Sequence, residues 1–260
     1  MAARLDAPMN KGRTTVLWGE VAAHAALAGR RVSVADVCAV APRSAQLDGA
    51  WVAAARDSEP DFLMCVTDRV SEQLAEFQLT LGEGPCHDVL GSAAPVLAAD
   101  LDDAEYSRRW PAFTPAAREL DVGSVFVFPL IVGVIRAGVL GLYRGPAGPL
   151  PDDMLGDLLI LADAAMVLLL DSARGYVPDV DVDRNGPGLD GQAPDLALHR
   201  AEIDQATGML TVQLDVPAAQ AFARLRAYAY AQDRRLADVA ADIVTRRLRL
   251  HRDLGQDGGP

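Results

Sequence analysis

The chain lacks any long hydrophobic run and has few cysteines. Its longest apolar stretch, Leu158–Leu170, is interrupted by Asp163, whereas a membrane helix needs about 18 residues without charge. The cysteines are an odd number without CxxC spacing, which argues against a zinc site and favours a reducing compartment. We therefore expect a cytoplasmic protein with no membrane partner and no bound metal. The three cysteines are Cys38, Cys65 and Cys86.

The sequence also lacks the motifs of the common enzyme classes. It contains no Walker loop, dinucleotide fingerprint, nucleophile elbow or zinc-protease helix. The acidic cluster between Asp100 and Glu105 does not have the spacing of a metal-binding loop, so we interpret it as a solvated turn. We expect no enzymatic activity and no cofactor.

Enough apolar residues are present for two domains. The 260 residues are 50% hydrophobic and carry a formal net charge of −12. In the first part, the pattern predicts two helices, a β-hairpin, a helix, a third strand, a helix, a second hairpin and a closing helix. This order indicates an α+β fold with an antiparallel sheet. The expected helices lie at about 14–30, 33–46, 69–81, 110–120 and 151–171, and the strands at 50–54, 62–66, 95–101, 124–131 and 136–143.

The C-terminal part has the pattern of three amphipathic helices. Apolar residues recur at helical spacing over 196–210, 217–229 and 236–248. Because each helix has one apolar stripe, we expect the three stripes to be buried against one another in an all-α bundle. We place Gly208 at a helix crossing, since a glycine inside a helix costs about 1 kcal/mol.

Arginine is concentrated in this last part. Residues 198–260 contain nine arginines and eight acidic residues, a net charge of +1, so residues 1–197 carry −13. An arginine-rich bundle on an acidic chain favours an anion-binding face. A solvated helix surface would give the same composition and is the alternative.

Three separated motifs in this part carry a family resemblance. The segments 206–210 (ATGML), 221–229 (AFARLRAYA) and 235–240 (RLADVA) resemble the ANTAR domain, a three-helix RNA-binding module of transcription antitermination. Residue 207 is threonine where the family often has lysine. For Arg226, an ion pair with Asp233 or Asp238 is the alternative to an RNA contact. The resemblance implies RNA contacts by Arg200, Thr207, Arg224, Arg226, Tyr228, Arg234 and Arg235, and a structural motif of Ala206, Gly208, Ala221 and Leu225.

The first part resembles a GAF domain. The matching motifs lie at 78–86 (QLTLGEGPC), 109–113 (RWPAF), 128–130 (FPL) and 141–143 (GLY). GAF domains are sensory folds that bind small molecules beside the sheet, so the resemblance implies a signal-sensing or dimerisation module. We expect an irregular loop around Gly82–Pro85, with a ligand or redox site formed by Gly84, Cys86 and His87. Attachment of a bilin at the Cys–His pair and a purely structural thiol are the alternatives.

These resemblances divide the chain into five segments. They are a tail at 1–13, the GAF domain at 14–172, a linker rich in Gly, Pro and Asp at 173–195, the ANTAR domain at 196–252 and a tail at 253–260. They imply a homodimeric antitermination regulator that binds RNA hairpins in nascent transcripts, with an unknown small-molecule ligand in the GAF domain. The alternative is a sensor-adaptor whose C-terminal bundle binds protein or DNA.

Overall fold

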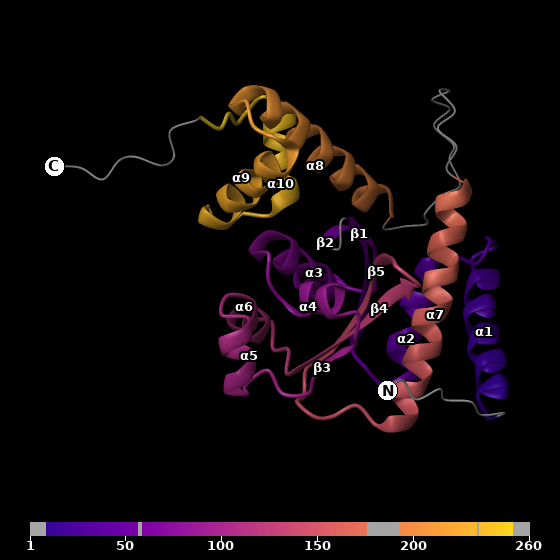
Figure 1. Ribbon diagram of the computed structural model, residues 1–260. Coiled ribbons are helices and arrows are strands. Elements are labelled where there is room, and N and C mark those ends of the chain that lie inside the picture. Colours follow the sequence, from indigo (N-terminus) through magenta and orange to yellow (C-terminus); the bar gives the residue numbers. More distant parts are fainter. Residues whose placement is uncertain (1–8, 57–58, 176–192, 233, 252–260) are drawn as a thin grey trace.

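The protein consists of an N-terminal domain built on a β-sheet and a C-terminal helical bundle (Figure 1). The computed structural model describes residues 9–56, 59–175, 193–232 and 234–251. We call residues 9–175 the N-terminal domain and residues 193–251 the helical bundle. This arrangement confirms the predicted fold class, an α+β domain followed by an all-α bundle.

A five-stranded antiparallel sheet forms the centre of the N-terminal domain. Its strand order is β2-β1-β5-β4-β3. The two predicted hairpins, β1–β2 and β4–β5, are both present, and β1 and β5 pair to join them into one sheet. The strands are β1 (Gly49–Arg56), β2 (Glu59–Val66), β3 (Val96–Ala98), β4 (Ser124–Val132) and β5 (Ile135–Arg144).

Helices cover both faces of this sheet. In β1, Ala50 and Val52 belong to one apolar core whereas Trp51 and Ala53 belong to the other, because successive side chains of a strand point to opposite faces. Helices α1 (Met9–Leu27), α2 (Val34–Ser44) and α7 (Asp152–Gly175) pack on the first face. On the second face lie α3 (Arg69–Leu81), α4 (Pro85–Ser92), α5 (Ala104–Arg109) and α6 (Phe113–Glu119) (Figure 1).

Three elements differ from the sequence prediction. Helix α1 begins at Met9, so the predicted tail at 1–13 is too long. The segment after Gly84 is a helix rather than an irregular loop, because Pro85 occupies the first turn of α4, where its missing N–H leaves no broken hydrogen bond. The predicted helix at 110–120 corresponds to α6 alone, which begins later, at Phe113, and the separate helix α5 before it was not predicted. Trp110 precedes a proline, which disfavours helical backbone, and it ends α5.

The helical bundle contains the three expected helices around one core. They are α8 (Ala193–Leu214), α9 (Ala218–Ala231) and α10 (Leu236–Val244). The fully buried residues Leu210, Leu225 and Val239 come one from each helix. In the ranges that the structure describes, no helix has both the length and the hydropathy to cross a bilayer.

The predicted linker and tails are only partly covered by the structure. Helix α7 continues to Gly175 and α8 starts at Ala193, so both ends of the predicted linker at 173–195 are helical. Residues 176–192 lie outside the described residues, as do 1–8 and the predicted C-terminal tail at 253–260.

A buried carboxylate joins α1 to α2. Asp36 is completely buried and accepts hydrogen bonds from both terminal nitrogens of Arg30, each at 2.7 Å, and from the Ser33 amide at 2.8 Å. His24 Nδ1 of α1 lies 2.8 Å from Asp36 Oδ1. Burial alone would raise the pKa of Asp36, but the hydrogen bonds from His24, Arg30 and Ser33 outweigh it and lower the pKa.

We predict that Asp36→Asn lowers the free energy of unfolding at pH 7 by about 3 kcal/mol, because it leaves Arg30 without its charge partner in a buried site. The folded-state pKa of Asp36 is depressed. Its contribution is therefore complete above the unfolded pKa of about 3.9 and is lost as the pH falls through the folded pKa. Urea unfolding at several pH values measures this difference, which should shrink in acid.

The control for this prediction is Asp102→Asn. Asp102 and Arg118 form an ion pair of 2.8 Å in which both side chains are well exposed, so the loss should stay below about 1 kcal/mol. An equal loss for both variants at pH 7 would contradict the role assigned to Asp36.

Candidate nucleic-acid interface

The residues expected to contact RNA do not lie on one open face. Arg224 of α9 is exposed. Arg234 donates to Asp242 Oδ2 at 2.7 Å on the bundle surface. Tyr228 packs partly into the bundle core and Thr207 is half-buried. Arg200 lies in α8, but its side chain is outside the part of the chain that the structure describes.

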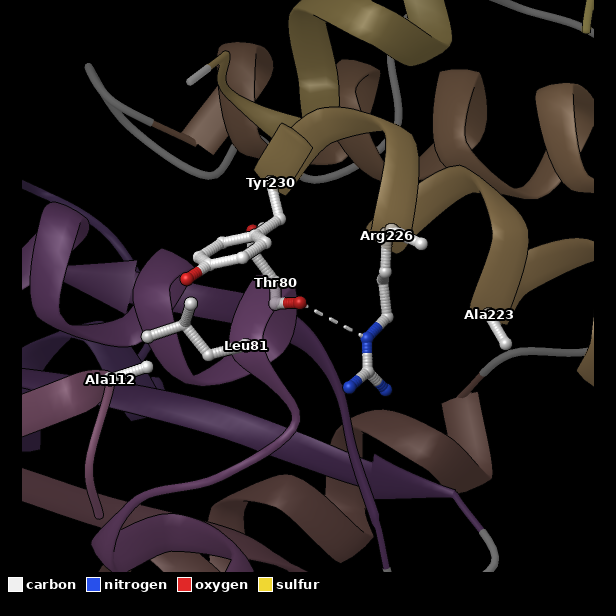
Figure 2. A pocket seen from close by; sticks show the side chains of 7 residues that line it. Thr80, Leu81, Ala112, Ala223, Arg226 and Tyr230 are labelled. Atoms are coloured by element: carbon white, nitrogen blue, oxygen red, sulfur yellow. Dashed lines mark hydrogen bonds between the residues drawn. The ribbon is translucent and has the colours of Figure 1, made fainter. Parts of the chain in front are cut away.

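Arg226 instead points out of α9 toward the N-terminal domain. Its Nε donates to the carbonyl oxygen of Thr80 at 3.4 Å (Figure 2). Its guanidinium lies 5.7 Å from the ring centroid of Phe222. Of the two acids proposed as its alternative partners, Asp238 does not accept this bond, and Asp233 lies outside the described residues. Burial lowers the pKa of Arg226.

A pocket of about 360 Å³ lies beside this arginine, between the two parts of the protein. Tyr230 and Arg226 project into it from α9, while Leu81 closes it from the end of α3 (Figure 2). Tyr230 is 61% exposed, so a planar group could reach it from solvent. The pocket is lined by Thr80, Leu81, Ala112, Ala223, Arg226, Ala227 and Tyr230.

Arg235, which precedes α10, binds two carboxylates of α3. Its Nη2 lies 2.6 Å from Glu72 Oε1, and its Nε lies 2.9 Å from Glu76 Oε2. The α3 helix is fixed at its start by Asp68, whose carboxylate accepts the Ser71 amide at 2.8 Å. Arg226 and Arg235, both expected to bind RNA, are therefore held by the N-terminal domain. Glu72 and Glu76 were not predicted as their partners. The only signal was their spacing of four residues on one helix face.

The second expected site, around Gly84, is tightly packed. Gly84 adopts φ of +124° before α4, and the Cys86 amide donates to Gln78 Oε1 at 2.7 Å. Cys86 is buried, and burial raises the pKa of its thiol to about 12. His87 Nδ1 lies 2.6 Å from Glu59 Oε2, and its Nε2 lies 2.9 Å from the Gln78 carbonyl. Because the pKa of the Cys86 thiol is raised, the thiolate that redox chemistry needs is disfavoured.

The expectation for Gly208 is wrong. Gly208 is exposed, and a Cβ built on it would meet nothing within 4 Å. The other residues of the expected structural motif, Ala206, Ala221 and Leu225, are fully buried. Ala206 of α8 thus faces the bundle core, whereas Gly208 lies on the side of α8 that faces solvent.

Comparison with protein families matches part of the helical bundle. Residues 196–244 match the family model of the ANTAR domain, so the chain carries an ANTAR domain within its helical bundle. No curated protein sequence matches the chain.

Several solved structures that are similar to the chain are GAF domains. The GAF domain of a phosphoenolpyruvate-protein phosphotransferase from Coxiella burnetii is 18% identical, with a TM-score of 0.48 over 65% of this chain and 97% of that one. The second GAF domain of DevS from Mycobacterium smegmatis is 21% identical, with a TM-score of 0.40 over 55% of this chain and 94% of that one.

We predict that Gly208→Ala stabilises the helical bundle by about 0.5–1 kcal/mol, because alanine is the better helix former and its methyl group meets open space. Chemical denaturation followed by circular dichroism measures the change. As a control for bundle unfolding, Leu225→Ala should cost about 2–5 kcal/mol, since Leu225 is fully buried. Destabilisation by Gly208→Ala would show that the glycine is needed for packing after all.

Proposed function

We propose that this protein is a transcription antitermination regulator that binds RNA hairpins in nascent transcripts through its ANTAR domain. The observation that carries the proposal is the match of residues 196–244 to the ANTAR family, on a bundle with several arginines on its surface. Guanidinium groups bind phosphates in a bidentate manner and stack on unpaired bases. A hairpin loop offers both kinds of contact.

The proposed RNA face centres on α9. Arg226 and the exposed Tyr230, four residues apart on one helix face, supply a cation and an aromatic surface, and Arg224 adds a second cation on another side of the helix. Arg235 lies at the start of the next helix. Splayed bases of a loop are recognised by stacking on such groups, while phosphates are bound by the arginines around them.

For the N-terminal domain, we propose a role in sensing or dimerisation. Its similarity to GAF domains is one of fold, so the nature of any small-molecule ligand is left to experiment. A homodimer would present two helical bundles to paired hairpins. The proposed regulator acts in the cytoplasm, where transcripts are made, and carries out no catalysis.

Sequencing of RNA cross-linked to the tagged full-length protein in its native cells tests this function. Enrichment of hairpins upstream of terminators is the expected result. Enrichment of promoter DNA in the parallel experiment, with no RNA, would favour the alternative in which the bundle of a sensor-adaptor binds DNA. Enrichment of neither would contradict nucleic-acid binding.

We predict that Arg226→Ala weakens binding of an enriched hairpin by about 1–3 kcal/mol, the loss expected for a specific base contact. Arg226→Lys should recover little, because an ammonium group neither forks nor stacks. Titrations at several salt concentrations measure the affinities. The control Arg108→Ala removes the same charge from an exposed position on α5 and should leave the affinity unchanged. If both alanine variants bind like wild type, Arg226 makes no net contribution to RNA binding.

A further inference from the structure

Helix α3 presents a row of hydrogen-bond acceptors to the helical bundle. Glu72 and Glu76 are four residues apart, one helical turn, and they share the guanidinium of Arg235. At the end of the same helix, the Thr80 carbonyl accepts from Arg226. We call Glu72, Glu76 and the Thr80 carbonyl the α3 acceptor row.

The α3 acceptor row accepts hydrogen bonds from Arg226 and Arg235, as the oxygen atoms of RNA would. A guanidinium presents donors that fit two oxygen acceptors at once, whether these belong to carboxylates or to phosphate. In Arg235 the Nε donates to Glu76 and the Nη2 donates to Glu72. In Arg226 the Nε is used by Thr80, and the guanidinium lies over Phe222. A phosphate or a base cannot occupy these places while α3 fills them.

The backbone of the N-terminal domain also closes around Arg226. Gly82, the residue that ends α3, adopts φ of +71°, and a Cβ built on it would overlap the Arg226 guanidinium. The arginine therefore lies in a space that is open only because this position has no side chain. Glu59 of β2 is close enough to act on the charge of Arg226 as well.

We propose that the α3 acceptor row is an intramolecular competitor of RNA. When the helical bundle is docked on α3, Arg226 and Arg235 are unavailable, and RNA binds after the bundle undocks. This inference rests on the proposed function, because both arginines belong to the proposed RNA face. The N-terminal domain thereby regulates the ANTAR domain through a contact that mimics its ligand.

The docked contact has the properties of a reversible one. Arg235 is 44% exposed, and ion pairs of this exposure are individually weak and screened by salt. RNA that binds only the undocked bundle shifts the population toward that state. The apparent association constant for RNA equals that of the undocked bundle multiplied by the fraction of molecules that are undocked. Weakening the α3 acceptor row should therefore tighten RNA binding, although it leaves every RNA-facing residue unchanged.

The docked state is tested first without RNA, by modifying the full-length protein with phenylglyoxal and measuring each arginine by mass spectrometry. Arg224 is exposed on the same helix and serves as the internal reference. Arg226 and Arg235 should react several-fold more slowly than Arg224 in wild type. In Glu72→Gln/Glu76→Gln, which keeps the side-chain volumes, their rates should approach that of Arg224. Equal rates for all three arginines in wild type would overturn docking.

Competition is tested by measuring the affinity of the full-length proteins for one RNA hairpin. This hairpin is the one most enriched when wild type or the double variant is cross-linked to RNA. If about one molecule in ten is undocked, Glu72→Gln/Glu76→Gln should bind this hairpin up to about tenfold more tightly. The control Glu105→Gln/Glu119→Gln removes the same charge from exposed positions on α5 and α6 and should bind like wild type.

The outcomes separate the two ideas. Equal affinity of the interface variant and the control variant would overturn competition while leaving RNA binding intact. Failure of both wild type and the interface variant to enrich any RNA would overturn the proposed function, and competition with it. The phenylglyoxal rates would still report in that case whether the bundle docks on α3. All variants should first show the melting temperature of the wild type.

Discussion

Strand β1 is buried on both faces, and the position of helix α3 depends on its pairing. The Ala50 amide of β1 donates to Thr67 Oγ1, and the neighbouring Asp68 begins α3 with its carboxylate. From β5, the hydroxyl of Tyr143 donates to the same carboxylate at 3.1 Å. Burial raises the pKa of Tyr143, which keeps this donor protonated. The acidic side of α3 is thereby held rigidly by the sheet, facing the helical bundle.

The parts of the fold that repeat a local pattern could be predicted from the sequence. Short apolar runs between turn signals identified the strands of the sheet. The spacing of apolar residues in the bundle identified the core around Leu225, because one face of a helix recurs every third to fourth residue. Gly208 was misjudged because a glycine in a helix has no local signature that separates a packing contact from an exposed position. The later start of α6 follows from the proline after Trp110, which disfavours helical backbone at that residue.

The candidate site could be predicted only in part. The arginines of the helical bundle were identified by resemblance, but their surroundings depend on residues far away in sequence. Arg235 binds Glu72, 163 positions earlier, and no local pattern reports such a pair. Arg234, its neighbour, binds Asp242 within the bundle instead. Two adjacent arginines thus have different environments, which only the packing of the two domains decides.

The ends of α7 and α8 give the docked contact a further property. Only residues 176–192 separate Gly175 from Ala193, so the two surfaces are held together covalently. A short connection gives its partners an effective concentration on the order of millimolar. A contact too weak to form between separate molecules can therefore be well populated within this chain. This effective concentration also decides how strongly RNA must bind. Free RNA that is present below this concentration must bind the bundle correspondingly more tightly than α3 does in order to displace it.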